Sequence, residues 1–454
     1  MMKPVEERIQ DAKAYRKSTS RSSLGAWEPQ MNRPIVKQLL LEQEETRQKE
    51  LIPIRRERMS VSPFTFFRGA AVIQAHDIAS TPGTPFRVQA CGDAHMSNFG
   101  IFASPERRLV FDINDFDETL PAPFEVDVKR LIASIEICGR CRGFTGEQSA
   151  SAVHDAAAAY RQAMREYSDM GNLDVWYHHV DVEDLVEENA DSMNKQQAKK
   201  VEEMREKVLA KNSDRAVRKL TETVDGRLRI KSDPPLIVPI REMLDSEKML
   251  YDFKDIMKAI ELYKESLPAE RRGLIDQYQP IELAHKVVGV GSVGRKAWIL
   301  IMMGRDNGDP LVLQIKEAEQ SVLEKYYGAS AYAECGRRVV EGQRAIQTAG
   351  DILLGWLRLN FQNGSRHDYY VRQLWDAKGS FDLDAISFEG YHKLSMLCAR
   401  TLAHAHAKTG DRHAIAAYLG KGEVFERAMA RYAIAYADQN EADYEEFMKF
   451  NAGY

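Results

Sequence analysis

Residues 86–118, FRVQACGDAHMSNFGIFASPERRLVFDINDFDE, carry the pattern from which the fold is predicted. They contain short runs rich in Val, Ile and Phe, separated by turn-forming residues, and this arrangement is typical of strands joined by tight turns. Residues 104–107 (SPER) are the expected hairpin tip between the runs NFGIFA and RLVFDI. The stretch therefore predicts a β-hairpin with a polar loop before it and an acidic cluster after it.

The polar loop is Gly-Asp-Ala-His-Met-Ser-Asn at residues 92–98. An Asp followed five residues later by an Asn is the spacing of a phosphotransfer catalytic loop, in which the Asp accepts a hydrogen bond from the attacking hydroxyl and the Asn oxygen binds Mg²⁺. Asp93 and Asn98 are therefore the candidate catalytic residues. His95 lies between them, and we expect it to orient the loop or Asp93 rather than to act as the base.

The acidic cluster consists of Asp112, Asp115, Asp117 and Glu118. Carboxylates that gather at the end of a strand repel one another unless water or a cation neutralises them. Mg²⁺ prefers one or two carboxylates together with phosphate oxygens and water, so a Mg²⁺ ion that bridges ATP phosphates would neutralise this cluster. The alternative is an acidic surface turn without a metal.

A glycine-rich segment, GVGSVG at residues 289–294, precedes the β-like run WILIM. Because glycines allow backbone amides to approach phosphates closely, Gly289, Gly291, Ser292 and Gly294 are the candidate triphosphate-binding residues. A Rossmann dinucleotide-binding loop is the rival interpretation. Such a loop enters a helix, whereas a β-like run follows here, so the sequence disfavours it.

Lys316 ends the next β-like run, LVLQIKEA, and the pattern matches the strand of a kinase small lobe whose lysine pairs with nucleotide phosphates. A helix with a partner glutamate is expected after it, and Glu324 and Glu341 are both candidates. The alternative is an ordinary solvated lysine. Arg68, in the apolar segment SPFTFFRGAA, is predicted to contact either a phosphate or a buried acidic partner.

These motifs occur in an unusual order, because in a protein kinase the glycine loop and the lysine precede the catalytic loop. Here they follow it. A second Gly-Asp-x-His begins at Gly410, but Ala416 stands where the carboxamide is needed, so Asp411 is not expected to be catalytic. The chain therefore resembles a circularly permuted protein kinase, and residues 369–375 would be the connector that contacts adenine.

This resemblance implies an α+β fold with two lobes, a β-rich small lobe and a mainly helical large lobe. The length of 454 residues exceeds the usual size of one compact core. The expected parts are a loosely attached N-terminal arm (1–35), a large-lobe part with the catalytic loop and metal-binding segment (36–235), the small lobe (236–380) and C-terminal helices that return to the large lobe (381–454).

The motifs GDAHMSNFG and NDFDETLPAPFEVDVKRL resemble the pattern of aminoglycoside and choline kinases. By this resemblance Asp93 is the base, Asn98 is a metal ligand, Asp115 is the metal aspartate and Asp127 is a structural anchor. The gap between Asn98 and Asp115 is a few residues longer than in that pattern, so Asp112 is the alternative metal ligand.

From about residue 50 onward the chain also resembles the bacterial domain-of-unknown-function family 2252. The phrases that carry this resemblance are SPFTFFRGAA, CGDAHMSNFG, FDINDFDETLPAPFE and YADQNEADY. The family name assigns no activity, so this resemblance does not itself indicate a reaction. The expected reaction comes from the kinase-like motifs.

The composition is that of a globular protein, with 44% hydrophobic and 29% charged residues and a net charge of -5. A negative balance argues against a nucleic-acid partner, which needs a basic face. No apolar run is long enough to span a bilayer and the start lacks the core of a signal peptide, so we expect a cytoplasmic protein without a membrane partner. Cys138 and Cys141 form a CxxC inside a helical run, where their spacing needs no redox or metal role.

Together these features predict a phosphotransferase that uses ATP and Mg²⁺ and acts on an unidentified small-molecule or protein hydroxyl, with nucleotidyl transfer as the open variant. One alternative is a non-catalytic nucleotide-binding regulator that uses the same residues. The other is a metal-dependent hydrolase built on Asp93, His95 and the acidic cluster, which would leave the glycine-rich segment and Lys316 without a role.

Overall fold

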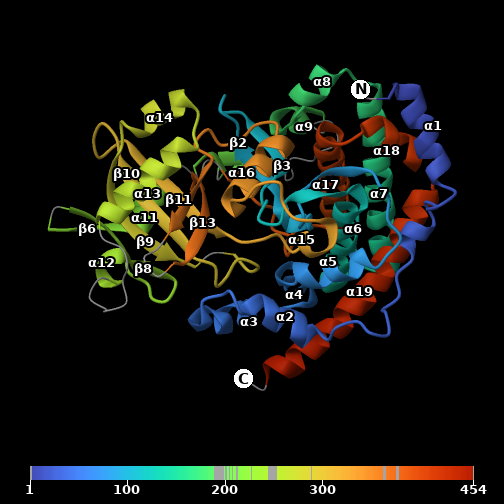
Figure 1. Cartoon of the computed structure of the whole chain (residues 1–454), viewed down its shortest axis with the longest axis horizontal. Coiled ribbons are helices and arrows are strands. Elements are labelled where there is room, and N and C mark those ends of the chain that lie inside the picture. The colour runs from blue at the N-terminus through green and yellow to red at the C-terminus, as the bar shows by residue number, and fades with distance from the viewer. Residues whose placement is uncertain are drawn as a thin grey trace.

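The computed structural model describes residues 3–188, 199, 202–203, 205–206, 208–210, 213–225, 227–243, 253–287, 289–360, 364–374 and 378–452. The protein is a mixed α+β structure, as predicted. Figure 1 shows a β-rich part beside a helical part, with the strands of residues 99–113 between them.

The β-rich part is built on a six-stranded antiparallel sheet with the strand order β12-β13-β11-β10-β9-β8. The strands are β8 (Ile237–Pro239), β9 (Gln279–Lys286), β10 (Ala297–Met303), β11 (Pro310–Ala318), β12 (Gly355–Asn360) and β13 (Arg366–Gln373). Trp298 and Leu300 of β10 share a core with α13 (Phe253–Glu265), while Ile299 and Ile301 share one with α11 (Ser213–Leu220). Because both of its faces are covered, β10 is one continuous apolar run.

The connections of this sheet position the predicted nucleotide-binding residues. The glycine-rich segment joins β9 to β10, Lys316 lies on β11, and α16 (Cys335–Ile346) stands between β11 and β12. Smaller elements complete the part: β6 (Thr221–Val224), β7 (Arg227–Ile230), α12 (Ile240–Met243) and α14 (Ala269–Ile275). Leu220 and Ile230 belong to the sheet core, so the β-rich part begins before the predicted boundary at residue 236.

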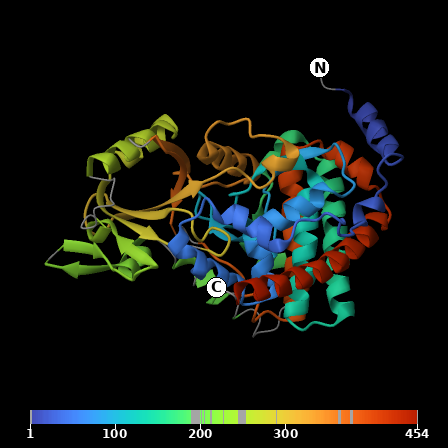
Figure 2. The same ribbon diagram turned by 60° about the horizontal axis from the view of Figure 1, so that its bottom comes forward.

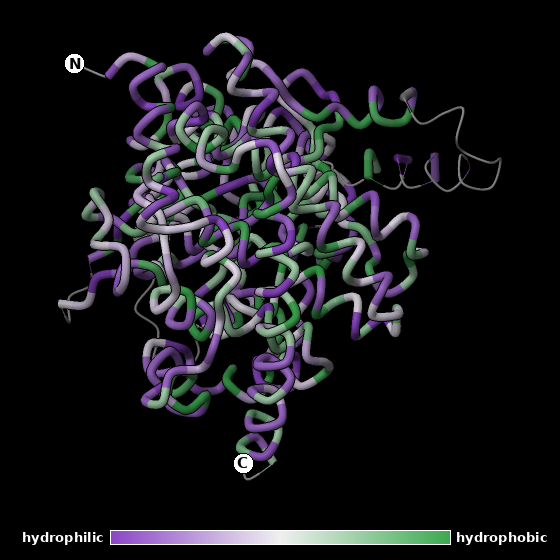
Figure 3. The backbone as a smooth tube through the Cα atoms, turned by 90° about the vertical axis from the view of Figure 1, so that its right-hand side faces the viewer, coloured by the Kyte–Doolittle hydropathy of each residue, from purple (hydrophilic) through white to green (hydrophobic). Residues whose placement is uncertain are grey.

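The helical part is a bundle in which α6, α7, α17 and α19 pack against one another. Figure 3 shows hydrophobic and hydrophilic residues mixed along the chain. The helix α7 buries one face, whereas α6 is buried from Phe124 to Gly139 because it lies inside the bundle. Its helices are α4 (Pro63–Gly69), α5 (Ala71–Ala79), α6 (Phe124–Cys141), α7 (Gly146–Asp169), α8 (Asn172–Tyr177), α9 (Val182–Glu188), α15 (Glu324–Tyr327), α17 (Phe388–Thr409), α18 (Arg412–Leu419) and α19 (Val424–Asn451).

The predicted hairpin lies against this bundle. β2 (Phe99–Ala103) pairs antiparallel with β3 (Leu109–Ile113), and the Arg107 N–H donates to the Ser104 carbonyl across the tip, so the prediction is confirmed. β5 (Val180–Asp181) extends this sheet, and β1 (Arg87–Ala90) pairs with β4 (Leu120–Pro123) beside it. The loop of residues 92–98 therefore lies between two small sheets.

The N-terminal segment is not the loosely attached arm that its polar composition predicted. Its helix α1 (Val5–Tyr15) packs against α18, Leu24 is fully buried, and Arg33 forms ion pairs of 2.7 Å with Asp77 and 2.6 Å with Asp443. The charges suggested a solvated arm, but several of them have partners far along the chain.

The next segment, residues 36–59, has a charged sequence that predicts a helix broken near Pro53. It forms two helices, α2 (Val36–Glu44) and α3 (Ile52–Met59), with Pro53 in the first turn of α3. Proline is tolerated there because the first amides of a helix have no partner within the helix. In Figure 2 these helices reach from the bundle towards the β-rich part.

Other predictions have mixed outcomes. The strand β12 was not predicted. The charged run of residues 192–220 predicts a surface helix, of which residues 192–198 lie outside the described residues while Ser213–Leu220 form α11. Trp375, at the end of the expected connector, also lies outside the described residues. Asp411, which was predicted not to be catalytic, caps the N-terminus of α18 by accepting the Ala414 N–H. None of the helices in the described ranges combines the length and apolar character that crossing a membrane requires.

Candidate functional site

Asp127, near the start of α6, holds the beginning of the loop of residues 92–98 through hydrogen bonds to its backbone. The Asp127 carboxylate accepts the Cys91 N–H at 2.8 Å and the Gly92 N–H at 3.0 Å, and it lies 3.3 Å from His406 Nε2. Asp127 is fully buried, so it acts as the structural anchor that the sequence predicted. Gly92 has a φ of 84°, and a Cβ there would lie 2.1 Å from the Glu118 carbonyl oxygen, so glycine is required.

Asp93 points into the space above this loop. Its carboxylate accepts a hydrogen bond of 2.7 Å from Arg130 Nε, and its side chain keeps 19% of its surface exposed. Burial raises the pKa of Asp93 to about 6, although Arg130 opposes this shift. A carboxyl group with this pKa is ionised at neutral pH and basic enough to accept a proton.

His95 is buried beside Asp93. Its Nε2 lies 3.8 Å from the nearer Asp93 oxygen, which is too long for a hydrogen bond, and its Nδ1 is buried without a hydrogen-bond partner among the described residues. Burial, Arg68 and Arg130 hold the pKa of His95 well below its usual range, so the imidazole is neutral. The group that contacts and orients Asp93 is therefore Arg130.

Asn98 is oriented so that its amide oxygen can bind a cation. Its Nδ2 donates to the Asp93 carbonyl at 2.7 Å, which fixes the direction of the side chain, and Asn98 and Asp115 line the same cavity. Mg²⁺ takes few protein oxygens and is completed by phosphates and water. Within the described ranges no three His, Cys, Asp or Glu side chains form a metal-binding group. Asn98 and Asp115 are thus the residues that fit a magnesium ion shared with phosphates.

Asp112 does not fit the metal role that the sequence left open for it. Its carboxylate accepts the Ile113 N–H and interacts with the Thr348 backbone, and it is absent from the lining of the cavity. Burial raises the pKa of Asp112 to about 6. The two aspartates face different directions because Asp112 still belongs to β3 whereas Asp115 follows it.

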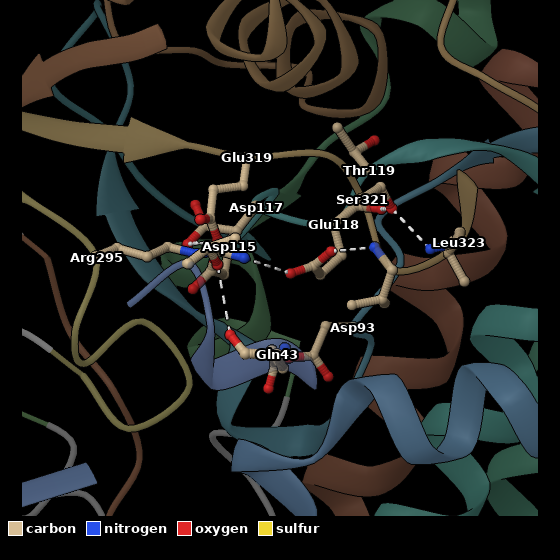
Figure 4. Close-up of polar contacts among 12 residues, drawn as sticks. Gln43, Asp93, Asp115, Asp117, Glu118, Thr119, Arg295, Glu319, Ser321 and Leu323 are labelled. Carbon is tan, nitrogen blue, oxygen red and sulfur yellow. Dashed lines mark hydrogen bonds and ion pairs between the residues drawn. The ribbon is translucent and has the colours of Figure 1, made fainter. Parts of the chain in front are cut away.

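Asp117 is the centre of an ion-pair network that joins the acidic segment to the β-rich part. It lies 3.0 Å from Lys316 Nζ and 3.4 Å from Arg295, and it accepts a hydrogen bond of 2.7 Å from the Tyr370 hydroxyl. Burial alone would raise the pKa of Asp117, but the two cations lower it below its ordinary value. Arg295 also reaches Glu118 at 3.1 Å, and Figure 4 shows Arg295 beside Asp117 and pointing toward Glu118.

Lys316 does not pair with either of the glutamates predicted for it. Glu324 accepts the Ser321 N–H and lies 3.7 Å from Arg338, and the partner of Glu341 is Arg344 at 3.6 Å. Helix α16 instead contributes Arg338, which donates to the carbonyls of Asp117 and Thr119. Helix α16 therefore stabilises the backbone of the acidic segment through Arg338. Lys316 pairs with Asp117 and not with a glutamate of this helix.

The glycine-rich segment is held from outside by the α2–α3 region. Arg58 donates to the Gly289 carbonyl, Arg47 to the Val293 carbonyl, and the Gln48 N–H to the Gly294 carbonyl at 2.8 Å. Gly289 and Gly294 have φ values of 72° and 93°, which residues with a side chain rarely adopt. These contacts hold carbonyls of the segment from outside, while inside it the Val293 N–H donates to the Val290 carbonyl.

The three sequence motifs meet at one cavity of about 100 Å³. Gly294, Lys316, Asp112 and Glu324 are not among its described lining residues, although Lys316 contacts Asp117, which is. The cavity is lined by residues of the loop 92–98, the acidic segment, the glycine-rich segment and the N-terminal helices, among them Asp93, His95, Asn98, Asp115, Asp117, Glu118, Gly289, Gly291, Ser292, Arg295, Gln43, Arg47 and Arg68.

Sequence reasoning missed most of the basic residues of this site. Arg47, Arg130, Arg295 and Arg338 lie in stretches that read as ordinary charged or amphipathic helices and turns. For Arg130 the sequence did contain one signal. It is a charged residue at a position that the helical pattern places in the interior, and such a residue needs a buried partner.

Fold and site together define a mixed α+β protein in which a carboxylate-rich, glycine-lined cavity lies between a β-sheet and a helical bundle. Residues 47–450 match the family described as "Uncharacterized protein conserved in bacteria (DUF2252)", and the chain belongs to this family. A search of curated proteins and a search of solved structures found no match to the chain.

Proposed function

We propose that the protein is an ATP- and Mg²⁺-dependent phosphotransferase with a circularly permuted, protein-kinase-like arrangement of its parts. The observation that carries this proposal is the meeting of Asp93, Asn98, Asp115 and the glycine-rich segment at one cavity. Residues almost two hundred positions apart supply, respectively, a base, metal ligands and phosphate-binding amides, which is the set that phosphoryl transfer needs.

The order of parts in the β-rich sheet also supports the proposal. The glycine-rich segment joins the first two of three consecutive antiparallel strands, Lys316 lies on the third, and a helix follows before the next strand. A protein kinase places its glycine loop, its lysine strand and its αC helix in the same sequence. The partner of Lys316 differs, because Asp117 takes the place of a helix glutamate.

In the proposed reaction, ATP supplies the phosphoryl group, and Asn98 and Asp115 would hold the Mg²⁺ that neutralises its phosphates. A bond forms between the acceptor oxygen and the γ-phosphorus, the bond from that phosphorus to the bridging oxygen breaks, and ADP leaves. Asp93 takes the proton of the acceptor hydroxyl. Arg130 keeps the Asp93 carboxylate in place through its 2.7 Å hydrogen bond.

One observation favours the alternative of a nucleotide-binding regulator without catalysis. Lys316 is already neutralised by Asp117, and the cavity is small, so the site is compact as it stands. A triphosphate would have to draw Lys316 away from Asp117 or bind beside the pair. The two functions use the same residues and differ only in whether ATP is consumed.

Binding and consumption of ATP, measured side by side on the full chain, test the proposal. We expect Mg·ATP to raise the midpoint of thermal unfolding, because a ligand that binds only the folded state stabilises it. We also expect ADP to form. AMP and pyrophosphate would indicate nucleotidyl transfer, binding without any product would indicate the regulator, and no binding would reject both.

The pH dependence of kcat/KM should report Asp93. Its pKa is raised to about 6, and only the ionised carboxylate can accept the hydroxyl proton. We therefore expect kcat/KM to be level above about pH 7 and to fall about tenfold per pH unit below pH 6. A profile that stays level down to pH 5 would contradict the assignment of Asp93 as the base.

A further inference from the structure

A second and larger pocket adjoins the catalytic loop. It encloses about 430 Å³, and Met96 and Ser97 of the loop form part of its wall. The end of α6 and residues 380–384 form other parts, whereas none of its described lining residues comes from the glycine-rich segment. The pocket therefore reaches the catalytic loop from a direction that the proposed triphosphate site does not occupy.

Arg68, on α4, lines both this pocket and the smaller cavity. Its Nε is buried without a hydrogen-bond partner, and the side chain has no hydrogen bond or ion pair within the described part of the chain. The charges that act on it come from both sides, with Asp93 and Asp115 in the smaller cavity and Asp384 in the larger pocket. Arg68 thus stands at the boundary between the two spaces.

An unpaired guanidinium in a largely buried position indicates an anionic ligand. Removing a charged group from water is unfavourable unless another group pairs with it, and a guanidinium pairs best with a carboxylate or a phosphate. Arg142 is a second arginine in the wall; one of its terminal nitrogens donates to the Ile386 carbonyl at 3.1 Å, and its Nε is buried without a partner in the described chain. Asp382 and Asp384 are exposed, so water screens their charge.

The remaining walls are suited to a small organic molecule. Phe64 and Phe99 contribute apolar surface, and Ser97 contributes a hydroxyl group next to the catalytic loop. A few polar groups set among apolar walls are typical of small-ligand sites. The pocket therefore fits a small compound that carries an anionic group and lies beside the loop.

Resting on the phosphotransferase function, we propose that this pocket holds the acceptor. The acceptor is a small hydroxylated molecule with a carboxylate or phosphate group, which Arg68 binds while the hydroxyl reaches Asp93. The competing assignment gives Arg68 to the triphosphate of ATP. The two assignments differ in whether an anion can still bind at Arg68 when the nucleotide site is full.

The test uses the full chain, the non-hydrolysable analogue AMP-PNP, Mg²⁺ and inorganic phosphate as the anion probe. The unfolding midpoint is measured with and without saturating Mg·AMP-PNP, and phosphate is then titrated at constant ionic strength against both states. The variants are Arg68→Gln and Arg68→Lys. The control is Arg305→Gln, which alters an exposed arginine paired with Asp306 in the turn between β10 and β11.

We expect phosphate to raise the midpoint of the wild-type nucleotide complex saturably by about 1–3 °C. The rise should be absent in Arg68→Gln, partly restored in Arg68→Lys and unchanged in Arg305→Gln. An equal rise in Arg68→Gln, no rise in the wild-type complex, or loss of AMP-PNP binding in Arg68→Gln would overturn the proposal. The effect of Mg·AMP-PNP on the wild-type unfolding midpoint is measured before any phosphate is added. If Mg·AMP-PNP does not shift this midpoint, the proposed phosphotransferase function itself is rejected.

Discussion

Replacing Asp93 with asparagine is expected to lower kcat by roughly 10²–10⁴-fold, the range typical of a lost general base. Asparagine keeps the size of the side chain and can still accept the hydrogen bond of 2.7 Å from Arg130, but it cannot take the hydroxyl proton. Binding of Mg·ATP should therefore change little. The measurement is steady-state ADP formation together with nucleotide affinity, on wild type and variant.

Asp112→Asn is the matched control for this change. Asp112 is a second buried aspartate with a pKa of about 6, but its carboxylate is bonded to the Ile113 N–H and lies outside the cavity lining. We expect kcat to stay within a few-fold of wild type. Turnover that survives in Asp93→Asn, or that is lost only in Asp112→Asn, would show that the catalytic role has been given to the wrong aspartate.

Replacing Asp127 with alanine should have the largest effect on stability. It leaves the Cys91 and Gly92 amides buried without an acceptor. Each orphaned buried donor costs about 1–3 kcal/mol, so the free energy of unfolding should fall by roughly 2–6 kcal/mol. A domain is stable by only about 5–15 kcal/mol, so this loss is a large fraction of the total stability.

Asp127→Asn provides a graded comparison. It keeps one acceptor oxygen, so we expect about half of the loss, together with reduced turnover because the loop that carries Asp93 is less firmly held. Denaturant unfolding measures the stability of both variants. If Asp127→Ala were as stable as wild type, the two amide bonds to Asp127 would not be holding the loop.

The parts of the fold that the sequence predicted well are those in which local pattern and tertiary role agree. The turn at residues 104–107 is set by its own residues, and the apolar run of β10 reads as a buried strand whatever surrounds it. Asp93 and Asn98 lie in one loop that Asp127 holds, and their short separation in sequence already placed them together; their catalytic and metal-binding roles stay predictions.

The missed parts depend on partners far along the chain. Lys316 pairs with Asp117, which lies in another part of the sequence, so the expectation of a nearby glutamate was reasonable but wrong. Arg47 and Arg58 bond to carbonyls of the glycine-rich segment, yet in sequence they belong to a charged helical stretch that resembles solvated surface. The sequence alone does not reveal whether a charged side chain at such a position faces water or contacts a distant loop.

The central claim is that distant segments of this chain close over one Mg²⁺-bound triphosphate. Isothermal titration of AMP-PNP into the full chain, with and without Mg²⁺ and with Asp115→Asn in parallel, tests it most directly. The account predicts one site per chain, with an affinity that falls at least about tenfold when Mg²⁺ is omitted or Asp115 is changed. Absence of binding, or an affinity indifferent to both Mg²⁺ and Asp115, would contradict it.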